Sequence, residues 1–232
     1  MDKTKLTKKL EGLPVLDILQ SLADTYTSQT IFTTSFGIED QVITDMIFKN
    51  NLNIKVVTLD TGRLFEQTYK VFHLTREKYK KNIEVFYPNT ESVQNLLSSK
   101  GPLSFYESVE NRKECCNIRK VEPLGRALNG MQCWITGIRA EQSFNRTAME
   151  MLEHDTTYNI LKVHPLFDWT LEQVMNYLRE NNVPYNSLHH DGFVSIGCTP
   201  CTRAIEHGED FRAGRWWWEN SNRKECGLHS KK

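Results

Sequence analysis

Alternating strand and helix patterns between residues 31 and 99 constrain the fold of this chain more than any other feature. Short runs of β-branched and aromatic residues, typical of buried strands, are separated by longer stretches whose apolar residues recur at helical spacing. The predicted strands are 31–36, 55–60 and 82–88, and the predicted helices are 39–50, 64–80 and 92–99. This alternation indicates an α/β fold with a mostly parallel, twisted sheet and helices on both faces.

The patterns continue on either side of this region. Apolar spacing predicts a covering helix over Val15–Tyr26 and a last long helix over 170–182, with Thr170 as its N-cap. The run 132–137 predicts a further strand. Beyond Pro184 the periodicity is lost, and an irregular stretch of this length inside a compact domain usually has a functional cause.

Length and composition favour one domain. With 232 residues and 39% hydrophobic residues, the chain has enough apolar material for a single core. We expect one domain over 1–232, in which residues 216–232 form an irregular, mobile C-terminal segment.

Charge and the first residues of the chain exclude several functional classes. The 29 basic and 29 acidic residues balance, so no net field attracts nucleic acid or an anionic membrane. The N-terminus is polar, and no stretch approaches 18 uninterrupted apolar residues. We expect a cytoplasmic protein that binds neither nucleic acid nor membrane.

Four of the six cysteines form two tight pairs that are remote in sequence. Cys115 and Cys116 are adjacent and lie in or at the start of a predicted helix, while Cys198 and Cys201 form a C-x-x-C pair. In a reducing compartment such pairs favour metal binding over disulfides, and four thiolates suit either zinc or an iron-sulfur cluster. Cys133 stands in an apolar run and is expected to be a small buried hydrophobe.

The motifs around these cysteines resemble one family over nearly the whole chain. The order of the motifs resembles that of assimilatory adenylylsulfate reductases: TTSFGIED, LDTGRLF, KECCNIRKVEPL, TGIRAEQS, IGCTPCTR, GRWWWE and KECGLH. The resemblance implies the adenine nucleotide alpha hydrolase-like (PP-loop) fold and a [4Fe-4S] cluster on the four paired cysteines. It also implies that Cys226 is the catalytic nucleophile and that Lys120 lies near the cluster, where it would partly neutralise the negative charge.

The same resemblance suggests the substrate contacts. Taken alone, the turn after the first strand would more often be an ordinary turn with Asp40 as a helix cap, but the family has a modified phosphate loop there. The segment after the second strand would line an adenosine pocket, and arginines would hold the phosphosulfate. The substrate-binding residues so implied are Ser35, Phe36, Gly37, Leu59, Asp60, Thr61, Gly62, Arg139, Arg212, Arg215 and His229.

The resemblance also implies a reaction with two partners. Cys226 would take the sulfo group from adenosine 5'-phosphosulfate (APS) as an S-sulfocysteine, and a separate reduced thioredoxin-type protein would release sulfite. One rival is reduction of the 3'-phosphorylated nucleotide (PAPS), or of both nucleotides. A rival of another class is a non-catalytic, zinc-stabilised regulator that binds a nucleotide and, unlike an iron-sulfur protein, is colourless.

Overall fold

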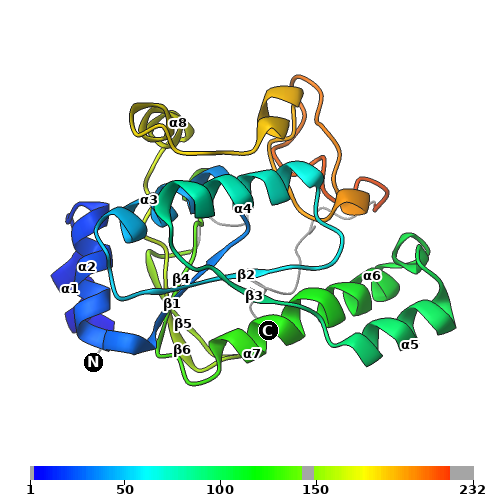
Figure 1. Ribbon diagram of the computed structural model, residues 1–232, viewed down its shortest axis with the longest axis horizontal. Helices are drawn as coiled ribbons and strands as arrows, with labels where there is room; N and C mark the ends of the chain where they lie inside the picture. The colour runs from blue at the N-terminus through cyan, green and yellow to red at the C-terminus, as the bar shows by residue number, and fades with distance from the viewer. Residues whose placement is uncertain (1–2, 143–148, 220–232) are drawn as a thin grey trace. The chain divides into compact units, whose positions relative to one another are not determined.

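The computed structural model describes residues 3–142 and 149–219 and contains a six-stranded sheet in the order β3-β2-β1-β4-β6-β5 (Figure 1). The strands are β1 Thr30–Thr34, β2 Lys55–Leu59, β3 Glu84–Phe86, β4 Cys133–Ile135, β5 Leu152–Asp155 and β6 Ile160–Val163. Strand β4 pairs in parallel with both β1 and β6, and β5 runs antiparallel to β6. The prediction of a mostly parallel α/β sheet is confirmed.

The α-helices are α1 Lys3–Leu10, α2 Val15–Tyr26, α3 Ile38–Lys49, α4 Glu66–Tyr79, α5 Thr90–Lys100, α6 Val109–Cys116, α7 Glu122–Leu128 and α8 Leu171–Glu180. Each helix predicted from apolar spacing is present, with bounds shifted by a few residues at most. Thr170 caps α8 as predicted: its hydroxyl accepts from the Gln173 backbone N–H at 3.2 Å, and the Gln173 side chain accepts from the Thr170 backbone N–H at 2.8 Å. This reciprocal pair is a capping box.

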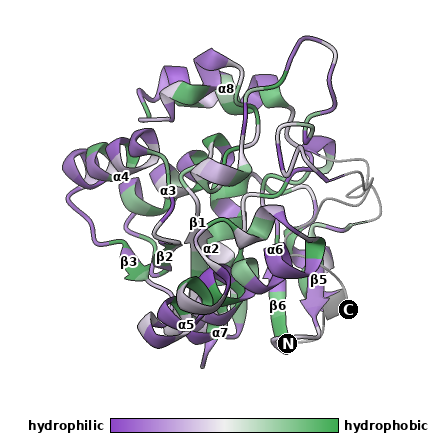
Figure 2. Ribbon diagram, turned by 90° about the vertical axis from the view of Figure 1, so that its right-hand side faces the viewer, coloured by the Kyte–Doolittle hydropathy of each residue, from purple (hydrophilic) through white to green (hydrophobic). Residues whose placement is uncertain are grey.

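Strands β5 and β6 were not predicted, because each has only four residues and both carry charged side chains. They form a hairpin at one edge of the sheet, with Leu152 opposite Val163 and Asp155 opposite Ile160. In Figure 2, β6 is mainly hydrophobic and the edge strand β5 is mainly hydrophilic. A polar edge strand is a common protection against pairing with other chains.

The chain divides into two compact units, each built from three stretches of sequence. The first, called here the sheet unit, comprises residues up to 57, 70–83 and 130–186. The second, called the cysteine unit, comprises 58–69, 84–129 and the chain from 187 onward. The expectation of a single domain stays a prediction, and the two units are described separately below.

The sheet unit has a continuous apolar core. Leu19 and Leu22 of α2 and Phe32 of β1 are fully buried in it, and α3 packs against both β1 and α8. A buried carboxylate ties three helices together, because Asp45 of α3 accepts from the Tyr79 hydroxyl of α4 at 2.5 Å and the Tyr177 hydroxyl of α8 at 2.7 Å. These helices hold β1 and its following loop in place.

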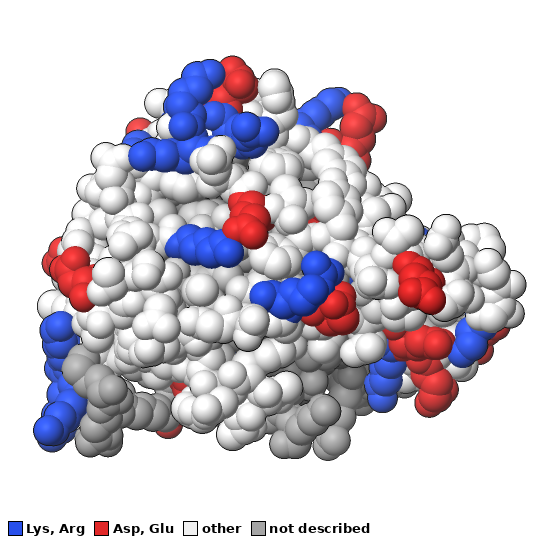
Figure 3. Space-filling model, turned by 60° about the horizontal axis from the view of Figure 1, so that its bottom comes forward, with Lys and Arg blue, Asp and Glu red and all other residues white. Residues whose placement is uncertain are grey.

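The surface agrees with the balanced composition. On the face drawn in Figure 3, basic and acidic side chains lie next to one another in several places, and a small group of basic side chains stands at the upper edge. Among the residues that the structure describes, no helix combines the length and apolarity needed to cross a membrane.

Candidate functional site

The first cysteine pair lies within a helix, as predicted, and stands at its C-terminal end. Helix α6 begins after Ser108, whose hydroxyl accepts from the Asn111 backbone N–H at 3.1 Å, and it ends with Cys115 and Cys116. The chain then continues through a π-helical turn over Asn117–Val121 into α7. Short π-helical segments often occur at functional sites, because they change the direction in which side chains leave the helix.

The second pair stands on a short 3-10 turn, Thr199–Cys201. The Cys201 backbone N–H donates to the Cys198 carbonyl at 2.9 Å, which closes the turn. The Thr202 hydroxyl donates to the same carbonyl at 3.0 Å, and the Tyr106 hydroxyl donates to the Pro200 carbonyl at 2.7 Å. The backbone of the C-x-x-C segment is therefore fixed by its own hydrogen bonds and by one from the Ser104–Tyr106 turn.

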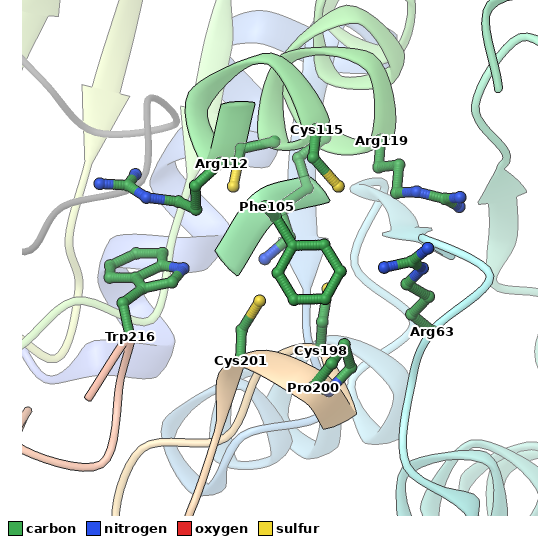
Figure 4. Close-up of a pocket in the computed structure, with 11 residues that line it drawn as sticks. Arg63, Phe105, Arg112, Cys115, Arg119, Cys198, Pro200, Cys201 and Trp216 are labelled. Carbon is green, nitrogen blue, oxygen red and sulfur yellow. The ribbon is translucent and has the colours of Figure 1, made fainter. Parts of the chain in front are cut away.

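All four paired cysteines line one pocket of the cysteine unit, which has an empty volume of about 350 Å³ and is partly open to solvent. Figure 4 shows the side chains of Cys115, Cys198 and Cys201 directed into the space between α6 and the C-x-x-C turn. The other lining residues are Arg63, Phe105, Arg112, Cys116, Arg119, Lys120, Pro200 and Trp216. Folding thus brings together two pairs that are more than 80 residues apart in the sequence.

The loop after β2 contacts both sides of this pocket. The Thr61 hydroxyl accepts from the Cys198 thiol at 3.3 Å, and the Thr61 carbonyl accepts from the Arg119 guanidinium at 2.6 Å. The Arg63 carbonyl accepts from the Thr199 backbone N–H at 2.8 Å. Gly62 lies between them with φ +69°, a conformation that favours glycine.

The electrostatic surroundings differ among the cysteines. Burial opposes ionisation of Cys198, but the charges of Lys120, Arg215 and Arg119 and the hydrogen bond with Thr61 outweigh it and lower its pKa. Burial, reinforced by the charge of Cys198, raises the pKa of Cys201 to about 12.

Cys115 behaves like Cys201. Burial raises its pKa, although the charges of Arg119 and Arg63 act in the opposite direction. A bound metal deprotonates its thiol ligands whatever their free pKa, so these cationic side chains would balance the charge of four thiolates.

The pocket fits an anionic occupant that accepts hydrogen bonds. Two buried donors that line it, Arg119 Nε and Trp216 Nε1, have no hydrogen-bond partner among the described residues. Buried donors are seldom left unpaired, so they indicate an acceptor-rich ligand in the pocket. The sulfides and thiolates of an iron-sulfur cluster are such acceptors.

A single metal ion and an iron-sulfur cluster need different arrangements of their thiolate ligands. Around one zinc ion, four thiolates converge at about 2.3 Å from the metal. Within residues 3–142 and 149–219, no three His, Cys, Asp or Glu side chains are grouped in a way that could hold one metal ion. The four cysteines that line the cavity supply the thiolate donors that a [4Fe-4S] cluster needs, and the identity of the metal stays a prediction.

The three arginines that follow the C-x-x-C segment have different environments. Arg203 forms a bidentate ion pair with Glu209, at 2.8 and 2.7 Å. Arg215 is buried and lies against the backbone of Gly197, and its Nε has no hydrogen-bond partner in the part of the chain that the structure describes. The Arg212 guanidinium lies 5.9 Å from the Trp216 ring centroid. Substrate contact by Arg212 and Arg215 stays a prediction.

In the sheet unit, the predicted phosphate loop holds an internal carboxylate. The backbone N–H and the hydroxyl of Ser35 both donate to Asp40 Oδ2, at 2.6 and 2.8 Å. Burial raises the pKa of Asp40 to about 6, although its hydrogen bonds with Ser35 and Gly37 lower it. Phe36 has φ +61°, so the loop is held in a conformation that few residues other than glycine adopt. These donors are the ones from which an anion cradle would be built.

Two other predicted contacts are also engaged within their own units. In the sheet unit, buried Arg139 forms ion pairs with Glu39 at 2.8 Å and Glu141 at 2.9 Å. In the cysteine unit, Asp60, which follows Leu59 of β2, accepts from the Gly62 backbone N–H at 2.8 Å and from the Tyr69 hydroxyl at 3.0 Å. Their nucleotide-binding roles stay predictions.

Two predicted site residues are not described by the structure, and three residues that line the cysteine pocket were not predicted. Cys226 and His229 lie outside the described residues, so the predicted nucleophile is not placed. Sequence reasoning did not single out Arg63, Arg112 or Arg119, which line the cysteine pocket. The only signal for the last two was their position within four residues of the cysteine pair.

Comparisons with known proteins agree with this geometry. Residues 29–204 match the model of the phosphoadenosine phosphosulfate reductase domain. The chain is 47% identical over 228 residues to adenosine 5'-phosphosulfate reductase of Agrobacterium fabrum, covering 98% of this chain and 87% of the relative.

Solved structures agree as well. The crystal structure of phosphoadenylyl-sulfate reductase from Candida auris has a TM-score of 0.74 at 29% identity, covering 88% of this chain and 98% of that one. Yeast FAD synthetase, with a TM-score of 0.56 at 15% identity and coverage of 89% and 71%, shares the fold alone, which confirms the predicted PP-loop fold class. The chain belongs to the phosphoadenosine phosphosulfate reductase domain family.

Proposed function

We propose that this protein reduces adenosine 5'-phosphosulfate to sulfite and AMP in assimilatory sulfate reduction. The observation that carries the proposal is the meeting of the two remote cysteine pairs in one pocket, in a chain whose similar relatives are named as reductases of this nucleotide. The same relatives favour APS over PAPS as the substrate. Reduction of PAPS, or of both nucleotides, is the alternative that kinetics must exclude.

The first step is a transfer of the sulfo group to a cysteine of the enzyme. The Cys226 thiolate attacks the sulfur of the phosphosulfate and forms an S–S bond. The bond between that sulfur and the bridging oxygen breaks, and AMP leaves with the electron pair on its phosphate. The enzyme then carries an S-sulfocysteine.

The second step needs a dithiol protein of the thioredoxin type. One of its thiolates attacks Cys226 Sγ, the S–S bond breaks, and sulfite leaves with the electron pair. The second thiol of the carrier then attacks the mixed disulfide and restores the Cys226 thiolate. The carrier is oxidised to a disulfide, and its two electrons have reduced the sulfur.

We further propose that Cys115, Cys116, Cys198 and Cys201 hold one [4Fe-4S] cluster. When bound, the cluster would link α6 to the C-x-x-C turn and place a negative charge beside Lys120 and Arg119. Arg212 and Arg215 are the proposed donors to the phosphosulfate, since a dianion needs fixed charge-assisted hydrogen bonds once water is excluded. None of the five described cysteines is in a disulfide, which is compatible with the proposed cytoplasmic location.

The reaction is tested by separating the two steps. Wild-type protein mixed with APS and no thioredoxin should gain the mass of one SO3 group and release one AMP. Added reduced thioredoxin should then release sulfite. Cys226→Ser should bind AMP as the wild type does but form neither adduct nor sulfite, and normal turnover by this variant would refute the mechanism.

Substrate choice and the metal are tested on the same preparation. Steady-state kinetics with APS and PAPS should give the higher kcat/KM for APS. Purified anaerobically, the protein should be brown. A colourless protein with stoichiometric zinc and no sulfite production would support the non-catalytic regulator instead.

A further inference from the structure

The Ser35 loop, residues 33–40 between β1 and the first turn of α3, already holds an anion of its own. The backbone N–H and the hydroxyl of Ser35 both donate to Oδ2 of Asp40, at 2.6 and 2.8 Å. The next backbone N–H, that of Phe36, donates to the Thr34 hydroxyl at 3.0 Å. Three donors that a phosphate could use at this loop are therefore engaged within the chain.

The Asp40 carboxylate is also held from its other side. Asp40 is only 8% exposed and is the third residue of α3. The strand end after β4 packs on it so closely that a β-carbon on Gly137 would lie 2.2 Å from Oδ1. The carboxylate therefore has no room to swing away from Ser35 toward β4.

The charge of Asp40 is not balanced by a cation. Within residues 3–142 and 149–219, no Lys, Arg or His side chain forms an ion pair with Asp40. Its neighbours on α3 differ, because Glu39 pairs with Arg139 at 2.8 Å and Asp45 pairs with Lys49 at 3.0 Å. Burial raises the pKa of Asp40 to about 6, so the carboxylate is still ionised near pH 7.5.

The arginine predicted to bind an anion in the same unit is engaged as well. Arg139 is 1% exposed, and its guanidinium donates to Glu39 at 2.8 Å, to Glu141 at 2.9 Å and to the Trp169 carbonyl at 3.2 Å. Two carboxylates thus oppose one guanidinium. The Ser35 loop and Arg139 are both supplied with negative charge from within the chain, which disfavours a further dianion at either.

Nucleotide-binding proteins use a carboxylate to distinguish a ribose hydroxyl from a ribose phosphate. In dinucleotide-binding folds, an Asp or Glu accepts a hydrogen bond from the sugar hydroxyl, whereas an arginine accommodates the phosphorylated sugar. An unpaired charge that repels the wrong ligand gives specificity without any new contact to the right one. APS and PAPS differ only in a 3'-phosphate, which is close to a dianion near pH 7.5.

We propose that Asp40 makes the Ser35 loop an anion-excluding element, which accepts a ribose with a free 3'-hydroxyl and rejects the 3'-phosphorylated nucleotide. Asp40 is then a specificity-determining residue that takes no part in the transfer of the sulfo group. The proposal rests on the proposed function, because it supplies a cause for the preference for APS over PAPS. It also changes the role of the loop from phosphate binding to ribose binding.

A phosphate-binding loop would behave in the opposite way. A 3'-phosphate would displace Asp40, take over the donors of Ser35 and strengthen nucleotide binding. The contacts of Asp40 oppose this displacement, because the carboxylate would lose its hydrogen bonds while Gly137 keeps it confined. A buried carboxylate without hydrogen bonds is strongly disfavoured.

Calorimetric titration of the complete, anaerobically purified protein at pH 7.5 separates the two roles. The ligands are AMP and adenosine 3',5'-bisphosphate, which differ only in the 3'-phosphate. Wild type should bind AMP at least about 30-fold more tightly than the bisphosphate. In Asp40→Asn, which keeps an acceptor for Ser35 but removes the charge, this ratio should fall about tenfold, while the Kd for AMP stays within about threefold of wild type.

The matched control is Asp45→Asn. It removes another buried carboxylate from α3, but one whose charge is balanced by Lys49. The ratio of the two dissociation constants should stay within about twofold of wild type, whatever the loss of stability. An equal fall of the ratio in Asp40→Asn and Asp45→Asn would show that a disturbed α3 sets it, and would overturn the proposal.

Turnover gives a second readout. In Asp40→Asn, kcat/KM for PAPS relative to APS should rise about tenfold, mainly through a lower KM for PAPS, because binding changes and the chemistry does not. Equal binding of AMP and the bisphosphate by wild type would overturn the proposal without any variant. If wild type forms no sulfite from APS, the proposed function fails, and the ratio of dissociation constants still decides the role of Asp40. Binding of neither nucleotide would overturn both.

Discussion

A β-carbon built on Gly137 would stand 2.2 Å from Oδ1 of Asp40. It would also lie 3.2 Å from the Asp40 backbone nitrogen and 3.2 Å from the Glu39 β-carbon. The strand end after β4 therefore packs directly on the first turn of α3, where the Asp40 carboxylate holds the Ser35 loop. Only glycine permits this approach, because the atoms that a side chain would meet include backbone.

Gly137→Ala should consequently destabilise the protein. Overpacking against a buried carboxylate and the backbone should lower the free energy of unfolding by about 1–3 kcal/mol, measured by urea denaturation. Gly37→Ala, at the start of α3, is the matched control, because its β-carbon would meet no atom closer than 3.7 Å. Equal stability of the two variants would contradict the close packing described here.

The raised pKa of Asp40 predicts a pH dependence of stability. The group titrates near pH 6 in the folded protein and near its ordinary 3.8 when unfolded, so the folded state binds the proton more tightly. The unfolding free energy therefore falls as pH rises through this window, by about 1 kcal/mol between pH 5 and pH 7 from this group.

Asp40→Asn removes that contribution. Between pH 5 and pH 7, the unfolding free energy of the wild type should fall by about 1 kcal/mol relative to that of Asp40→Asn. Asp24→Asn, which changes an exposed carboxylate, should run parallel to the wild type. A constant difference for Asp40→Asn would mean that Asp40 does not titrate between pH 5 and pH 7 in the folded protein.

Gly197→Ala tests the predicted role of Arg215 indirectly. The new β-carbon would lie 2.3 Å from Nη2 and 2.6 Å from Cζ of Arg215, so the guanidinium must move. If Arg215 contacts the phosphosulfate, Gly197→Ala and Arg215→Ala should each weaken binding of the nucleotide by about 1.5–3 kcal/mol, measured by calorimetry.

Two comparisons complete that experiment. Arg212→Ala should give a loss of the same order if both predicted contacts exist. Arg203→Ala should leave affinity unchanged, because Arg203 is engaged by Glu209. Wild-type affinity in Gly197→Ala and Arg215→Ala would remove Arg215 from the substrate site.

Iron and sulfide analysis tests the cysteine set. Anaerobically purified wild type should contain about four of each per chain, and Cys198→Ser should lose most of both. Cys133→Ser should retain the full content, because Cys133 is completely buried in the sheet unit core, where burial raises its pKa to about 12. Full iron content in Cys198→Ser would place the metal elsewhere.

Much of the fold could be predicted because it depends on local patterns. The alternation of strands and helices, the Thr170 cap and the burial of Cys133 all follow from periodicity, capping chemistry and apolar context within a few residues. Strands β5 and β6 could not be predicted in this way. Their four residues each acquire strand structure only by pairing with each other and with β4.

The candidate site was likewise predicted only in part. The pairing of four cysteines as a ligand set was evident from their types and spacing, and the pocket confirms that they lie together. The prediction that Cys115 and Cys116 lie in a helix is confirmed, but the π-helical turn that follows them was not predicted, because it has no local sequence signal.

By itself, the sequence determined the sheet class, the helices and the residue types available for thiolate ligation and anion binding, since these depend on periodicity and side-chain chemistry. Only the tertiary structure decided which charged side chains already have a hydrogen-bond or ion-pair partner within the protein. Asp40 occupies the donors of the Ser35 loop, Glu219 engages Arg112, and Glu209 engages Arg203. The Arg112–Glu219 ion pair depends on packing between elements, because burial of a charge is tolerated only where a partner in the right geometry is buried with it.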